Sequence, residues 1–148
     1  MKNLLLVAGA VAALTVPAFA TDDVITTRKN LMFSNGASAA LAGAMLKQEI
    51  PYTPVAGKAV LSSLNATSMA FGDYFPEGSD TGDTKARDTI WSDRAGFEAE
   101  LAKFQKSASE GNASGGREGP ADLAAFQAAV LPVLDSCKTC HEGYHVPD

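Results

Sequence analysis

Two thiols and an imidazole lie within five residues near the end of the chain, in the segment Cys137-Lys138-Thr139-Cys140-His141. On an α-helix, positions i, i+3 and i+4 share one face, so Cys137, Cys140 and His141 can all address one planar ligand. Cys-x-x-Cys-His is the spacing by which a c-type haem is attached. The thiols would form thioethers with the haem vinyls, and His141 would bind the iron as proximal ligand. Since the chain holds only these two cysteines, we expect one covalent haem c here.

The same pentapeptide permits other chemistry, which the sequence leaves open. A thioredoxin-like dithiol also uses Cys-x-x-Cys, but at the start of a helix that follows a strand, whereas here a long helical pattern precedes it. Together with His145, the motif could supply four zinc ligands, although adjacent ligands on one helix close a tetrahedron awkwardly. In an exported protein, a plain disulfide between Cys137 and Cys140 is a further alternative.

The first twenty residues are predicted to be a cleaved signal peptide. Lys2 gives a positive start, residues 4–16 form an apolar run, and residues 18–20 (Ala-Phe-Ala) form an A-x-A cleavage site. The run is too short to span a bilayer, so we expect export to the periplasm without a membrane span. The predicted mature chain, residues 21–148, is long enough for one domain.

The chain is acidic, with 17 Asp and Glu against 12 Lys and Arg. This balance argues against nucleic acid and anionic membranes as partners. It suits a carrier that meets a redox partner protein of basic or mixed charge. The sequence shows no Ser-His-Asp set, no paired catalytic carboxylates and no phosphate-binding loop, so we expect no enzymatic substrate chemistry.

Apolar residues recur at helical spacing in four segments, separated by regions rich in Gly, Pro, Ser or Asp. The predicted helices cover about residues 23–50, 54–74, 93–110 and 120–144. Ser92 or Asp93 can cap the third helix, and Pro120 can occupy the first turn of the fourth.

Short connections between four helices predict an all-α fold, an up-down-up-down antiparallel four-helix bundle around one cofactor. Asn35-Gly36 could mark a hairpin turn, but its flanks do not alternate, so a glycine within the first helix is expected. Pro132 is expected to kink the last helix without ending it, because the apolar periodicity resumes after it.

A C-terminal Cys-x-x-Cys-His on the last helix of an exported all-α chain resembles the class II cytochromes c, the cytochrome c-prime family. The resemblance covers nearly the whole mature chain and implies a bundle with one haem c. Family members are often homodimers through their first two helices. The other segments that carry the resemblance are Arg28 with Met32, residues 75–79, Thr84-Lys85, Ile90-Trp91, Phe97, Phe104 and residues 137–144.

Two branches of this family differ at the sixth position of the iron. The high-spin branch leaves it empty and binds nitric oxide or carbon monoxide, whereas the low-spin branch uses a methionine of the first helix and carries electrons. Met32 followed by Asn35-Gly36 resembles the low-spin pattern, as do residues 50–52 and Pro132. A thioether is soft enough to bind haem iron, and Met/His ligation raises the potential. The alternative is that Met32 only packs over an open iron.

Several polar residues are expected around the edge of the haem. Arg28 lies four residues before Met32, so both face the same way. A haem propionate is the natural partner of Arg28, through a bidentate fork, and the resemblance implies the same. The alternative is a solvated arginine at the helix surface. Lesser candidates for the propionate edge are Lys29, Thr84 and Lys85.

Two further residues flank the expected site. Trp91, the only tryptophan, is expected to contact the haem or to plug the end of the bundle. His145 stands where the family usually has Arg or Lys, close to the proximal ligand. Its alternative is a frayed terminal residue without a role.

Overall fold

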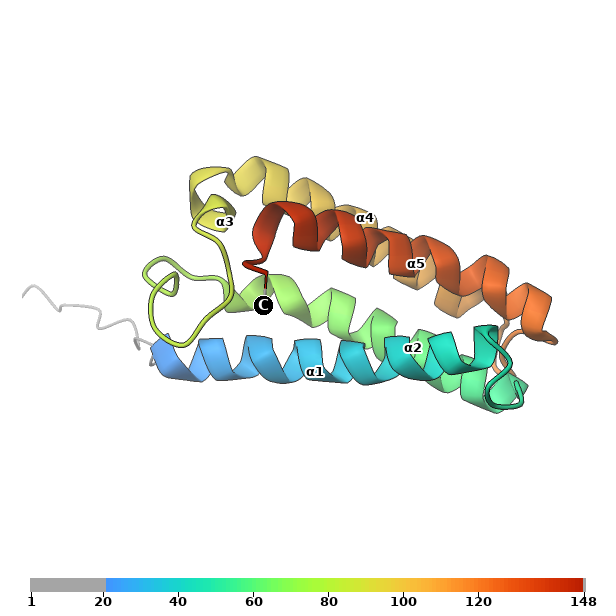
Figure 1. Cartoon of the computed structure of the whole chain (residues 1–148). Helices are drawn as coiled ribbons and strands as arrows, with labels where there is room; N and C mark the ends of the chain where they lie inside the picture. Colours follow the sequence, from blue (N-terminus) through green and yellow to red (C-terminus); the bar gives the residue numbers. More distant parts are fainter. Residues whose placement is uncertain (1–20, 148) are drawn as a thin grey trace, which may run out of the picture.

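The structure is a computed structural model that describes residues 21–147. The predicted signal peptide and Asp148 lie outside the described residues. The elements in chain order are α1 (Thr21–Leu46), α2 (Pro54–Phe71), the 3₁₀ helix η1 (Gly72–Tyr74), α3 (Thr89–Ser92), α4 (Arg94–Ser114) and α5 (Leu123–Tyr144). The four long helices run up and down along one common axis. The start of α1 and the end of α5 lie at the same end of the bundle (Figure 1). The predicted all-α four-helix bundle is therefore confirmed. Across residues 21–147, no helix is long and apolar enough to cross a membrane.

The first helix ends earlier than the sequence predicts. It stops at Leu46 rather than at Ile50, because Gln48 adopts a left-handed conformation with φ of 59°. The Gln48 and Glu49 amides donate to carbonyls of the last helical turn at 3.0 and 2.9 Å, as in helices that end in a left-handed residue. Asn35 and its glycine neighbour lie within α1, as expected.

The helices α4 and α5 begin at aspartate caps. Asp93 accepts a hydrogen bond from Gly96 N at 3.2 Å, which confirms the predicted cap region, and Asp122 accepts one from Ala125 N at 2.8 Å. The placement of Pro120 in the first turn of α5 is therefore wrong. It lies two residues before the cap, because the Asp122 side chain satisfies the free amides that start the helix.

The helix α4 extends to Ser114, beyond the end at residue 110 that the sequence predicts. A Cβ at Gly111 would lie 2.7 Å from the carbonyl oxygen of Ala129 on α5. Gly111 is therefore a contact residue between two helices rather than a loop residue, and its missing side chain lets them approach closely.

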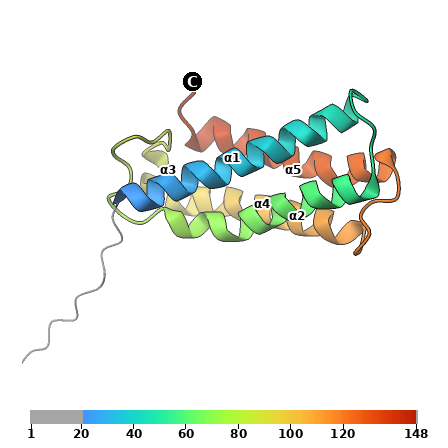
Figure 2. The same cartoon turned by 90° about the horizontal axis from the view of Figure 1, so that it is seen from below.

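Two apolar clusters fill the bundle. The larger includes Met45 near the end of α1 and Phe126 near the start of α5. Figure 2 shows the 47–53 and 115–122 connections together at that end of the bundle. The smaller cluster, which we call the aromatic cluster, consists of Phe75, Ile90 and Phe97, with Trp91 and Tyr144 packed against it. Its three buried members come from α3, α4 and the connection before them, so that long connection is packed rather than loose.

Candidate haem site

A cavity of about 530 Å³ lies between α1, α5 and the connection that precedes α3. This volume falls within the range of about 300–1,000 Å³ that is usual for cofactor pockets. Most of its wall is apolar. The apolar wall residues are Met32, Phe33, Ala39, Phe71, Phe75, Ala86, Ile90, Phe97 and Phe104.

The attachment residues lie on the α5 wall of this cavity. Cys137, Cys140 and His141 all line it, because they occupy positions i, i+3 and i+4 of one continuous helix. Cys137 and Cys140 do not form a disulfide, and Cys137 Sγ lies 3.3 Å from the carbonyl oxygen of Val133. The structure thus brings the three predicted residues to one apolar cavity, which is what covalent attachment of a planar haem requires.

The pKa values of the two thiols argue against dithiol exchange, and that of His141 suits ligation of a metal. Burial raises the pKa of Cys137, and burial with the nearby charges of Glu100 and Cys137 raises the pKa of Cys140 to about 11. A dithiol that exchanges disulfides needs a lowered pKa, so that alternative loses support. Burial, with a smaller contribution from His145, lowers the pKa of His141. The imidazole is therefore neutral near pH 7, as a metal ligand must be.

The geometry of His145 does not match a zinc site. Its ring stacks on that of His141, with centroids 4.8 Å apart and an interplanar angle of 23°, so the two rings do not converge on one ion. Within the described residues, no three His, Cys, Asp or Glu side chains form a group that could hold a metal. Nor is His145 frayed, since its amide donates to the carbonyl of His141 at 3.3 Å and it forms a β-bridge with Ala86.

Met32 lines the same cavity from α1. Gly36, one turn further on, also lines it, and a Cβ there would meet nothing within 4 Å, so the cavity reaches the helix backbone. Met45 is fully buried in the larger apolar cluster, and Met69 is 62 % exposed. Among the methionines of residues 21–147, Met32 alone contributes to the cavity wall.

Arg28 is a buried cation at the edge of the cavity. It is 4 % exposed, so the alternative of a solvated arginine is wrong. Its guanidinium lies over the Phe75 ring, 4.8 Å from the centroid. Its hydrogen-bond acceptors are neutral oxygens: Ser79 O at 2.7 Å, Ser79 Oγ at 3.0 Å, Thr84 Oγ1 at 3.2 Å and Tyr74 O at 3.2 Å. Burial lowers the pKa of Arg28, yet a guanidinium stays charged in proteins.

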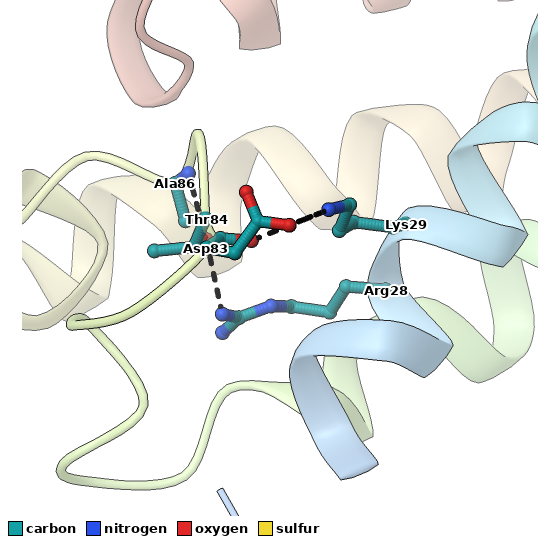
Figure 3. Close-up of polar contacts among 5 residues, drawn as sticks. All are labelled: Arg28, Lys29, Asp83, Thr84 and Ala86. Atoms are coloured by element: carbon teal, nitrogen blue, oxygen red, sulfur yellow. Dashed lines mark hydrogen bonds and ion pairs between the residues drawn. The ribbon is translucent and has the colours of Figure 1, made fainter. Parts of the chain in front are cut away.

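The other polar residues predicted for this edge lie beside Arg28. Lys29, Thr84 and Lys85 all line the cavity, and Lys29 Nζ forms an ion pair with Asp83 (Figure 3). Figure 3 also shows Arg28 and Lys29 reaching from α1 toward the same connection. Sequence reasoning missed Ser79 and Asp83 as partners. Their only sequence signal is a connection rich in polar residues, which does not indicate where it will fold.

Trp91 does not line the cavity. Its Nε1 donates to the carbonyl of Pro76 at 3.0 Å, and its ring lies 6.1 Å from that of Phe75 and 5.7 Å from the Arg28 guanidinium. Trp91 therefore packs against Phe75 and Arg28, and these two residues line the cavity.

An antiparallel four-helix bundle with Cys-x-x-Cys-His on its cavity wall defines a c-type cytochrome of the bundle class. The family model described as cytochrome C′ matches residues 23–145, and the chain belongs to this family. Accordingly, it is an electron-carrying haem protein with covalently attached haem c.

Curated relatives and solved structures agree with this assignment. The chain is 30 % identical to cytochrome c-556 of Rhodopseudomonas palustris over 97 % of each chain. It is 35 % identical to cytochrome c′ of Cereibacter sphaeroides over 99 % of each. The solved structure of cytochrome c′ from Rhodopseudomonas palustris superposes with a TM-score of 0.76 at 30 % identity, covering 85 % of this chain and 98 % of that one. The relatives therefore bear both names, c-556 and c′.

Proposed function

We propose that this protein is a periplasmic electron carrier whose haem iron is bound by His141 and Met32. The observation that carries the proposal is the shared cavity. It is lined by His141 from α5 and by Met32, alone among the described methionines, from α1. Met/His ligation suits electron transfer because it raises the reduction potential of the iron. The haem supplies one-electron chemistry, and the chain supplies its attachment, ligation and environment.

The cavity wall would give the haem a dry environment. Phe71, Phe75, Phe97 and Phe104 line it, and a wall of this kind excludes water and lowers the local dielectric. Burial of this kind is one of the protein's means of setting a haem potential.

Arg28 is proposed to face a haem propionate. Its four acceptors are neutral, so the buried charge lacks an anionic partner among them, and burying such a charge is costly unless it is paired. A propionate at this edge would supply that anion. The lesser contacts proposed for the same edge are Lys29, Thr84 and Lys85.

A second candidate is a five-coordinate haem that binds nitric oxide or carbon monoxide. The observation that favours it is the 35 % identity to a relative named cytochrome c′. In that case Met32 would be an adaptable side chain packed over an open iron.

Replacement of the candidate ligand tests the proposal. We expect the ferric holoprotein to show a low-spin visible spectrum, and Met32→Ala to show a high-spin one with ready carbon monoxide uptake on reduction. The matched control is Met69→Ala, which removes an exposed methionine of α2 and should leave the spectrum unchanged. A wild-type protein that is already high-spin would replace the proposal with the gas-binding candidate.

A further inference from the structure

Asn35 lies one helical turn after Met32 on α1 and lines the same cavity. It is 7 % exposed, and its Nδ2 donates a hydrogen bond to Met32 Sδ at 3.9 Å. Its Oδ1 is buried and has no hydrogen-bond partner within residues 21–147. A buried polar atom without a partner destabilises a fold, and such a group in a native protein requires an explanation.

The neighbouring thioether of Met32 explains why a polar side chain stands at position 35. A methionine sulfur is a weak hydrogen-bond acceptor with two lone pairs, so one can receive the amide N–H while the other remains for a metal. An apolar side chain at position 35 would fill the same space without an unpaired oxygen, but it could not fix the sulfur. Hydrogen bonds to ligating groups orient them and tune the metal.

We propose that Asn35 is a positioning residue for Met32, holding the thioether sulfur in the orientation that ligation of the haem iron requires. This inference rests on the proposed ligation by Met32 and goes beyond it. It names the residue that sets how tightly the Met32 sulfur holds the sixth coordination position of the iron. Without the amide, the side chain of Met32 gains rotational freedom and leaves the iron more readily. An external ligand then competes better for the site.

Carbon monoxide affinity of the reduced holoprotein measures this competition. The variants are Asn35→Leu, Met32→Ala and the double variant, since leucine is close in shape to asparagine and lacks the amide. We expect Asn35→Leu to raise the carbon monoxide affinity roughly tenfold, in line with the loss of one hydrogen bond to a metal ligand. In the Met32→Ala background, the same substitution should change nothing.

The matched control is Asn65→Leu on α2. Asn65 also has a buried Oδ1 without a partner among the described residues, but it does not line the cavity, so its replacement should leave the carbon monoxide affinity unchanged. An effect of Asn65→Leu as large as that of Asn35→Leu would overturn the proposal, because a general change in the fold would then explain both.

The remaining outcomes separate this inference from the ligation itself. An unchanged affinity in Asn35→Leu, with Met32→Ala still raising it, overturns the role of Asn35 and keeps Met32 as ligand. An equal effect of Asn35→Leu with and without Met32 also overturns it, since Asn35 would then act on the gas or on the fold. A high-spin wild-type protein that does not respond to Met32→Ala removes both the ligation and the inference.

Discussion

Arg28 and Ser79 are 51 positions apart in the sequence, yet the arginine makes two of its hydrogen bonds to that one residue. Ser79 is fully buried, and its hydroxyl also donates to the carbonyl of Pro76 at 2.8 Å. The guanidinium thus fastens the connection between α2 and α4 to α1, beside the cavity. A single buried side chain organises a segment that has little regular structure of its own.

Removing the Ser79 hydroxyl tests this fastening. We expect Ser79→Ala to lower the free energy of unfolding by about 1–3 kcal/mol, because a buried guanidinium N–H loses its acceptor. The measurement is urea unfolding of the holoprotein followed by circular dichroism. Ser92→Ala is the control: Ser92 is exposed and its hydroxyl donates to the carbonyl of Asp88, so a change within about 0.5 kcal/mol is expected. Equal losses in the two variants would contradict the fastening role.

The packing of helices explains why α4 and α5 can approach so closely. Gly111 of α4 is buried against the backbone of α5 at Ala129, whereas a Cβ at Gly43 of α1 would meet nothing within 4 Å. Both are helical glycines, and only the first is required by its neighbours. Sequence alone does not distinguish them, because the distinction depends on which helix lies opposite.

Alanine at these two glycines should have opposite effects. Gly111→Ala would place a methyl 2.7 Å from a backbone oxygen, which forces the helices apart and should cost about 1–3 kcal/mol. Gly43→Ala should stabilise by about 0.5–1 kcal/mol, since alanine loses less conformational freedom in a helix. Thermal unfolding of the holoproteins provides the comparison. If both variants were equally stable, the close contact between α4 and α5 would not be a constraint.

One end of the bundle holds the haem cavity. At the opposite end, which we call the closed end, the 47–53 and 115–122 connections lie side by side (Figures 1 and 2). At the closed end, the Tyr52 hydroxyl donates to the carbonyl of Pro120 at 2.5 Å, joining the connection after α1 to the one before α5. Nearby, Lys58 Nζ donates to Asn112 O at 2.8 Å. These contacts join the two helical hairpins at the end away from the attachment motif, and neither Tyr52 nor Lys58 lines the haem cavity.

Tyr52→Phe should therefore weaken the fold without altering the haem. We expect a loss of about 1 kcal/mol in the free energy of unfolding, with an unchanged visible spectrum. A shifted spectrum would contradict the separation of the two ends.

The effect of this substitution should also depend on pH. Burial, and then the charge of Asp122, raise the pKa of Tyr52 above its ordinary value of 10.0. The folded state therefore holds this proton more tightly than the unfolded state does, so the contribution is complete below about pH 10 and is lost as the pH rises through the folded pKa. The difference between wild-type and variant should shrink in urea titrations above about pH 10. A difference in the free energy of unfolding that stays constant on both sides of that pH would contradict this pH dependence.

The sequence alone determined the features that depend on neighbours a few residues apart. The face shared by Cys137, Cys140 and His141 follows from helix geometry, and the four apolar periodicities follow from one buried side per helix. Only the tertiary structure decided the partners of Arg28, the cavity that Asn35 and Met32 line together, and the close contact at Gly111. The physical reason is that these depend on where distant segments and side-chain rotamers come to rest, and helical spacing carries no information about either.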